Sequence, residues 1–181
     1  MSSALIDKEI YINHMIEKYS NMIYRLAIAR TKNKEDAEDV FQEVFLKLSK
    51  KLPNFENETH EKAWLIRVTI NLTNNLFQSA HFRKTVPLEE NLKFEDKEMS
   101  NVYFQVLSLP NKYRTMIHLF YYEGFSVKEI ANILHTNENT VKTRLSRARE
   151  QLKSKLEGGF DEWEIRTIIN KQMKKLYLQS N

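Results

Sequence analysis

Apolar residues recur along most of this chain every three or four positions, the spacing that keeps side chains on one face of an α-helix. A first stripe comprises Ile12, Met15, Ile16, Tyr19, Met22, Ile23 and Leu26. A second follows Asn33, a residue suited to cap a helix, and comprises Ala37, Val40, Phe41, Val44, Phe45 and Leu48. A third helix is predicted over 61–82, with an inward stripe of Leu65, Val68, Leu72 and Leu76. No segment has the alternation of paired strands, so the pattern predicts an all-α fold.

The rest of the chain divides at its few helix-breaking residues. Short helices are predicted near 100–108, 111–122, 127–134 and 137–156, and an amphipathic helix after the glycine pair at 158–159. Residues 85–99 (TVPLEENLKFEDKEM) are acidic and poor in apolar side chains, which is typical of a linker. We therefore predict four segments: a helical domain 1–84, a linker 85–99, a second helical domain 100–157 and an extension 158–181. The extension either completes the core of the second domain or covers a binding surface until a partner displaces it.

The second domain carries the pattern of a helix-turn-helix. Ser126 and Glu129 form the S-x-x-E capping box that opens the segment VKEIANIL. The turn LHTNEN follows, with His135 or Asn137 where glycine is common, and Val141 begins the next helix. A capped helix, a tight turn and a β-branched anchor are typical of DNA-binding helix-turn-helix units.

The second helix of this motif has one apolar and one hydrogen-bonding face. Its apolar stripe comprises Val141, Leu145, Ala148, Leu152 and Leu156. Burying this stripe turns the opposite face outward, where hydroxyl and cationic groups suit base edges and phosphates. The candidate DNA contacts are Thr140, Lys142, Thr143, Arg144, Ser146 and Arg147. A solvated helix with incidental charge is the alternative interpretation.

Two polar faces of the first domain are also candidates for binding. Residues 35–45 (EDAEDVFQEVF) carry five carboxylates and no basic residue. They fit a metal or acid–base site, a solvated acidic face, or a docking surface for a basic protein patch. In the third helix Arg67, Asn71, Asn74 and Gln78 form a polar stripe. Amides suit the edges of bases that have left the stack.

Composition excludes some classes of protein. The 181 residues are 41% hydrophobic, enough for packed cores, and the net charge of +4 favours an anionic partner. There is no cysteine, the five histidines are scattered, and no glycine-rich phosphate loop is present. We therefore expect no enzyme activity, no cofactor and no metal site. The chain begins without a signal peptide and has no membrane-length apolar run, so we expect a cytoplasmic protein without stable membrane insertion.

These segments together resemble the extracytoplasmic-function group of the sigma-70 family of bacterial RNA polymerase sigma factors. The resemblance covers residues 8–157 and rests on DAEDVFQEVF, KAWLIRVTIN, SAHFRK, LPNKYRTMIHLFYYEGFSVKEIANIL and NTVKTRLSRAREQL in that order. It departs at Asn75 and Gln78, where the family often has aspartate and arginine, and at Ala80, where it often has tryptophan.

The resemblance implies a promoter-specificity subunit. The acidic helix would dock on the clamp helices of the largest polymerase subunit through Asp36, Asp39, Gln42 and Glu43, and the second domain would lie on the flap of the second-largest subunit. The −10 element would be bound by Phe55, Arg67, Asn71, Asn74, Gln78, Arg83 and Lys84, with Asn71 at the position that reads a flipped base. The helix-turn-helix would bind the −35 element.

The sequence leaves open the role of Phe55, the presence of an anti-sigma partner and one alternative function. Phe55 either covers the core edge or lines a base pocket, whereas Trp64 is assigned to packing. Family members are often held by an anti-sigma factor, which the resemblance adds as a candidate partner. A stand-alone helix-turn-helix regulator is the alternative function; it would bind duplex tightly without polymerase.

Overall fold

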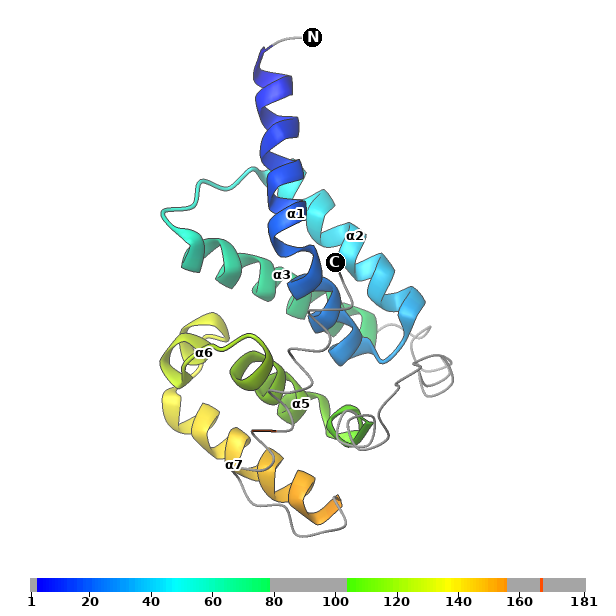
Figure 1. Ribbon diagram of the computed structural model, residues 1–181, viewed down its shortest axis with the longest axis vertical. Helices are drawn as coiled ribbons and strands as arrows, with labels where there is room; N and C mark the ends of the chain where they lie inside the picture. Colours follow the sequence, from blue (N-terminus) through cyan, green and yellow to red (C-terminus); the bar gives the residue numbers. More distant parts are fainter. Residues whose placement is uncertain (1–2, 79–103, 156–166, 168–181) are drawn as a thin grey trace. The chain divides into compact units, whose positions relative to one another are not determined.

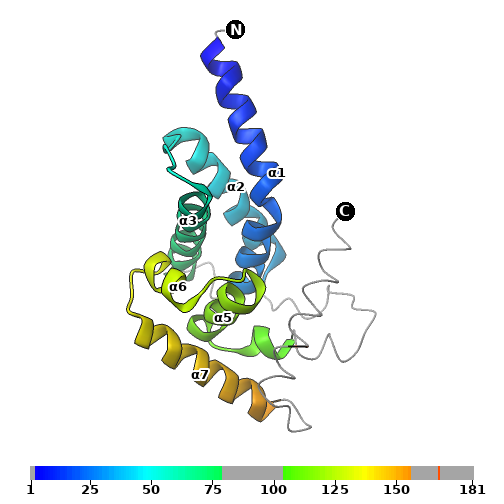
Figure 2. The ribbon, with the colours of Figure 1, turned by 60° about the vertical axis from the view of Figure 1, so that its left-hand side comes forward.

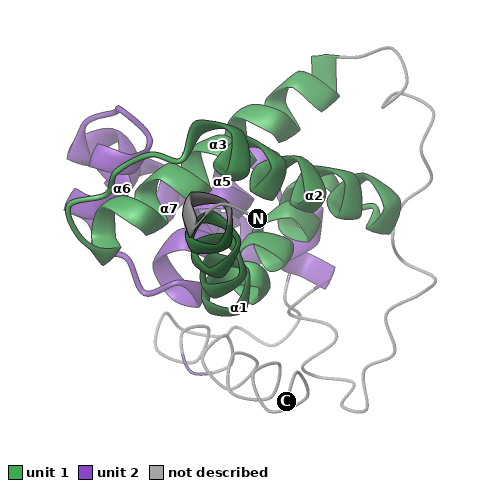
Figure 3. Cartoon of the chain, turned by 90° about the horizontal axis from the view of Figure 1, so that it is seen from above, with its two compact units in different colours: residues 1–88 green, residues 89–181 purple. Residues whose placement is uncertain are grey.

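The computed structural model describes residues 3–78, 104–155 and Thr167, and the regular structure in these residues is helical throughout. The chain divides into two compact units, Met1–Leu88 and Glu89–Asn181, which Figure 3 colours separately. The division lies within the range predicted as linker. The predicted linker falls outside the described residues, as does the C-terminal helix apart from Thr167. In the described part of the chain no helix is long and apolar enough to cross a membrane.

The first unit is built from α1 (Ser3–Thr31), α2 (Lys34–Lys51) and α3 (Glu58–Gln78), each of which packs against the other two (Figure 1). The predicted stripes of α1 and α2 supply most of the core. Their most deeply buried side chains include Met15, Tyr19, Ile23, Leu26, Val44 and Leu48. Asn33 caps α2 as predicted: its side-chain oxygen accepts the Asp36 backbone N–H at 2.9 Å.

The inward face of α3 differs in part from the prediction. Leu65 is fully buried, but Val68, Leu72 and Leu76 are only half-buried. Ala63, Ile66, Thr69 and Thr73 take the buried positions instead. The threonine hydroxyls donate to the carbonyls of Leu65 and Thr69, one turn earlier, which satisfies them inside the core. Apolar spacing alone missed the C-terminal part of this face because it does not count threonine.

A polar contact joins α1 to the start of α3. Tyr19 Oη and Lys18 Nζ both donate to Glu61 Oε2, at 2.5 and 3.1 Å. Burial raises the pKa of Glu61, but these two donors outweigh burial and bring the pKa below its usual 4.5. Burial, helped by the hydrogen bond to the carboxylate, raises the pKa of Tyr19 to about 12.

The second unit contains a helical segment at 104–108, then α5 (Asn111–Ile117), the π-helical turn η3 (His118–Tyr122), α6 (Val127–Ile133) and α7 (Glu138–Lys155) (Figure 2). The helix predicted over 111–122 thus widens at its C-terminal end, where the Glu123 N–H bonds to the His118 carbonyl. Arg114 is buried and its Nη1 donates to the carbonyls of Leu107 and Leu109, both at 2.7 Å. This arginine ties the first helical segment to α5.

The helix-turn-helix is confirmed as α6 and α7. Ser126 and Glu129 form the reciprocal capping box at the start of α6. His135 is the turn residue in the left-handed region, with φ of 49°. Asn137 has the other role in the turn, because its Oδ1 accepts the Thr140 N–H at 2.7 Å. Val141 and Ile130 are fully buried where α6 and α7 pack together.

Replacing Ser126 with alanine should destabilise the second unit by about 1 kcal/mol, since it removes the hydroxyl that accepts the Glu129 backbone N–H and donates to Glu129 Oε2. Urea unfolding followed by circular dichroism measures the loss. Ser154→Ala is the control, because Ser154 is an exposed serine inside α7 whose hydroxyl donates to the Gln151 carbonyl of the same helix. Equal stabilities for the two variants would contradict the assigned role of the cap.

The stability of the first unit should fall in acid partly through Glu61. Its pKa is lower in the folded protein than the ordinary value of 4.5, so its contribution is present above that pH and is lost as the pH falls through the folded pKa. Glu61→Gln should flatten the dependence of the unfolding free energy on pH in this window. Glu17→Gln, an exposed change on α1, should keep the wild-type profile. A Glu61→Gln profile that runs parallel to wild type would disprove the linkage.

Candidate nucleic-acid interface

The exposed face of α7 lies opposite a buried seam. Val141, Leu145, Ala148 and Leu152 are buried, as predicted, and Leu156 lies outside the described residues. Thr143 and Arg147 are exposed, whereas Thr140, Arg144 and Ser146 are half-buried. The structure therefore presents hydroxyl and guanidinium groups together on the face that the sequence predicted.

Contacts within the helix divide this face into two sides. Lys142 pairs with Glu138 at 3.9 Å, and Ser146 Oγ donates to Glu150 Oε1 at 3.3 Å. Both residues lie on one side of the helix and already have a side-chain partner. On the other side, Thr140, Thr143, Arg144 and Arg147 border an open hollow.

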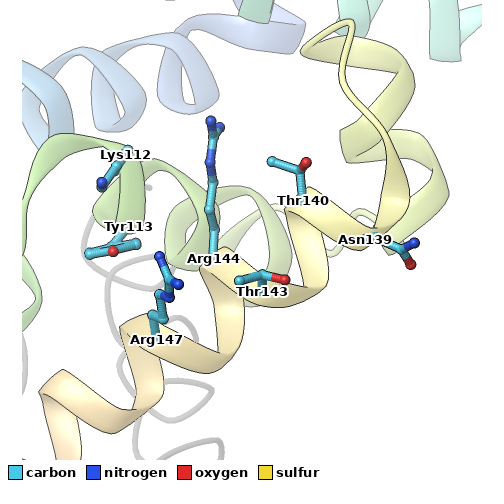
Figure 4. Close-up of a pocket in the computed structure, with 7 residues that line it drawn as sticks. All are labelled: Lys112, Tyr113, Asn139, Thr140, Thr143, Arg144 and Arg147. Atoms are coloured by element: carbon cyan, nitrogen blue, oxygen red, sulfur yellow. The ribbon is translucent and has the colours of Figure 1, made fainter.

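The hollow of about 390 Å³ is formed by two helices of the second unit (Figure 4). Asn139 joins the four α7 residues that border it, and Lys112 and Tyr113 enter from α5. None of these three residues was among the predicted contacts. Asn139 had a signal in the sequence, since it is a polar residue in the first turn of the recognition helix. Lys112 had none, because only the packing of α5 on α7 brings it there.

The polar stripe of α3 is present in the first unit. Asn71, Asn74 and Gln78 are exposed and Arg67 is half-buried. Thus three of the four predicted side chains are exposed along one side of this helix. Arg83 and Lys84 lie outside the described residues.

A buried arginine that sequence reasoning missed supports this stripe. Arg30, only 5% exposed, donates from Nε to Thr73 Oγ1 at 2.5 Å and from Nη2 to Asn74 Oδ1 at 2.7 Å. Because the carboxamide oxygen of Asn74 accepts this bond, the orientation of its NH₂ group is set by α1. The sequence signal for Arg30 was its position, as a cation just after the apolar stripe of the first helix.

Phe55 and Trp64 form an aromatic pair near the start of α3. The rings of Phe55 and Trp64 meet edge to face, with centroids 5.9 Å apart and planes at 63°. Both residues are half-buried. This contact agrees with a packing role for Trp64 and gives Phe55 a share in that packing, with part of its surface still exposed.

The acidic helix α2 presents three of its four candidate docking residues. Asp39 and Gln42 are exposed, and Glu43 is half-exposed beside Lys47, with 3.3 Å between Oε1 and Nζ. Asp36 is only 6% exposed, because it faces inward in the first turn of α2. Of the four candidate docking residues, Asp39, Gln42 and Glu43 are therefore the ones on the outer side of α2.

Comparison with known proteins gives matches over both units. Residues 15–83 match the family model described as Sigma-70 region 2, and residues 101–152 match Sigma-70, region 4. The ECF RNA polymerase sigma factor SigW of Bacillus subtilis is 32% identical over 162 residues, covering 78% of this chain and 87% of SigW. The RNA polymerase sigma-H factor of Pseudomonas aeruginosa is 27% identical, covering 79% of this chain and 84% of that factor.

Solved structures share the fold. The sigma factor RpoE of Bartonella quintana, solved with the anti-sigma factor NepR, gives a TM-score of 0.69 at 22% identity, covering 82% of this chain and 98% of RpoE. CnrH, solved with the cytosolic domain of CnrY, gives a TM-score of 0.62 at 22% identity, covering 81% of this chain and 87% of CnrH.

Replacing Arg30 with methionine should destabilise the first unit by about 1–3 kcal/mol, since it removes a donor from the buried Thr73 hydroxyl as well as from Asn74. The side-chain amide resonances of Asn74 should shift in a ¹⁵N–¹H spectrum. Those of Asn71, one turn away and without an arginine partner in the described structure, should stay in place. Unchanged Asn74 resonances would show that Arg30 does not orient this carboxamide.

Proposed function

The chain belongs to the extracytoplasmic-function group of the sigma-70 family of RNA polymerase sigma factors, and from this membership we propose how its residues divide the work of promoter recognition. A sigma factor directs core polymerase to promoters and starts transcription there. The observation that carries the proposal for this chain is the exposed face of α7, where hydroxyl and guanidinium groups gather opposite the buried seam.

We assign the −35 element to α7. Thr143 lies in the N-terminal half of the second helix of a helix-turn-helix, the part that enters the major groove in proteins of this kind, and Arg147 follows one turn later on the same face. Arginine suits guanine edges and phosphates, and a threonine hydroxyl contacts either. Thr140, Lys142, Arg144 and Ser146 complete the predicted surface.

We assign the melted −10 element to α3. The exposed amides of Asn71, Asn74 and Gln78 can bond the edges of unstacked bases, and the exposed part of Phe55 offers a stacking surface. Binding the open strand more tightly than duplex would supply free energy for melting. Arg67, Arg83 and Lys84 would hold nearby phosphates.

The acidic face of α2 is our candidate for docking on polymerase. Asp39, which has no ion-pair partner in the described structure, lies beside Gln42 and Glu43 on the exposed side. We propose that this face contacts the clamp helices of the largest subunit and that the second unit contacts the flap of the second-largest. Asp36 is buried, so it would support this face from inside the fold and would not contact polymerase directly.

The remaining expectations follow from this role. The chain would act by binding alone, without enzyme activity, and in the cytoplasm, where polymerase meets the chromosome. The solved structure of RpoE is a complex with the anti-sigma factor NepR, which supports an anti-sigma factor as a partner here. A stand-alone regulator is not supported, because the matches include the polymerase-factor region 2 as well as the helix-turn-helix.

Reconstituted transcription tests the proposal directly. The purified chain is added to sigma-free core polymerase on fragmented host DNA, and RNA 5′ ends are mapped. Defined starts that share one pair of upstream elements are expected. Tight duplex binding by the chain alone, with no starts, would instead favour a stand-alone regulator.

On a promoter identified in this way, Arg147→Ala and Asn71→Ala should each lower transcript yield by roughly 5- to 150-fold, the cost of one lost base contact. Arg147→Ala should weaken binding to closed duplex promoter. Asn71→Ala should leave that binding intact and be rescued by a template already melted at −10. Asn21→Ala, an exposed change on α1, serves as the control. Yields equal to the control for both variants would refute these assignments.

A further inference from the structure

We propose that the hollow between α5 and α7 binds one phosphate of the DNA backbone, and that Lys112 is the ligand contributed by α5. This inference rests on the proposed function, because it takes α7 as the helix that meets duplex DNA. It adds a contact from outside the recognition helix. Lys112 is not among the DNA contacts predicted from the sequence. Arg144 and Arg147, which border the same hollow, are among them.

The charge around the hollow is of one sign. Lys112, Arg144 and Arg147 border it, and no carboxylate does. In the described structure none of these three cations has an ion-pair partner. Four lysines elsewhere have a glutamate partner one turn away, in the pairs Lys34–Glu38, Lys47–Glu43, Lys62–Glu58 and Lys142–Glu138. Three unpaired cations around one concavity repel one another until an anion enters.

The neutral groups of the hollow suit the same ligand. Thr140 and Thr143 add hydroxyl donors from α7, and such hydroxyls commonly bond DNA phosphates. The labelled side chains in Figure 4 reach the hollow from two helices, so an anion there can be held from more than one side. The hollow is also open, which suits one phosphate on a long polymer better than an enclosed small anion.

The base of Lys112 is well anchored. Arg114, two residues further along α5, is buried and holds the carbonyls of Leu107 and Leu109. The Lys112 side chain is exposed, and its Nζ lies 4.9 Å from the centre of the Tyr113 ring. The backbone at Lys112 is therefore held in place while its ammonium group stays accessible. A contact with phosphate then costs side-chain entropy but little backbone entropy.

A phosphate contact from α5 would act differently from those of α7. Phosphates carry no sequence information, but contacts to them fix the position of a protein on the duplex. A ligand on a second helix would set the angle at which α7 enters the groove. Lys112 is thus assigned a positioning role in promoter recognition.

Salt dependence of duplex binding provides the test. The full chain is titrated with short fluorescent duplexes of two unrelated sequences over a series of NaCl concentrations. Each phosphate neutralised contributes about 0.9 to the slope of log K against log[NaCl]. Lys112→Gln should therefore reduce the slope by about 0.9, with equal loss of affinity for both duplexes. Lys112→Arg should restore most of the slope.

Lys153→Gln is the matched control, since it removes one exposed positive charge from α7 at a residue that does not border the hollow. It should keep the wild-type slope. A Lys112→Gln slope equal to wild type would overturn the inference. Equal reductions in Lys112→Gln and Lys153→Gln would also overturn it, because they would indicate general charge and not a local site. Loss on one duplex only would indicate base reading and overturn it as well.

The same titration separates this inference from the proposed function. If the wild-type chain shows no salt-dependent duplex binding, the assignment of α7 to DNA fails, and the phosphate site fails with it. If the wild-type chain binds duplex and the Lys112→Gln variant has the same salt slope, only the role of Lys112 fails. Circular dichroism of each variant checks that the exposed substitutions leave the helices intact.

Discussion

Burial of the seam formed by Val141, Leu145, Ala148 and Leu152 is the constraint on which the DNA-binding unit depends. An α-helix that turns one side toward its neighbours must turn the other side outward, so the apolar residues decide which polar ones meet a ligand. The capping box at Ser126 sets where α6 begins, the left-handed His135 lies in the turn that ends it, and Asn137 caps the start of α7. Recognition chemistry in this unit is thus a consequence of packing.

The first unit follows the same rule with a more polar interior. Thr69 and Thr73 take buried positions on α3 because their hydroxyls bond within the helix. Arg30 enters beside them and satisfies Thr73 and Asn74 together, which links the core of α1 to the exposed amide stripe. A buried polar group is stable only when each donor has an acceptor, so this network also orders the surface next to it.

The two units give a sigma factor complementary kinds of surface. The face of α7 combines cations and hydroxyls, which suit duplex phosphates and groove edges. The face of α3 presents amides, which suit bases exposed by melting, and α2 is acidic, which suits a basic protein surface. Separate surfaces of different chemistry agree with a subunit that must hold polymerase, duplex and open strand in one complex.

The sequence by itself determined the helical class, the stripes of α1 and α2, the caps at Asn33 and Ser126, and the outward face of α7. These features depend on residues close together in the chain, where helical periodicity and capping chemistry act. Tertiary structure alone decided the inward turn of Asp36, the choice of Thr69 and Thr73 over Val68 and Leu72, and the bond from Arg30 to Asn74. It also brought Lys112 to the hollow beside Arg144. Each of these outcomes depends on which helix packs against which, and spacing along a single helix carries no record of its neighbours.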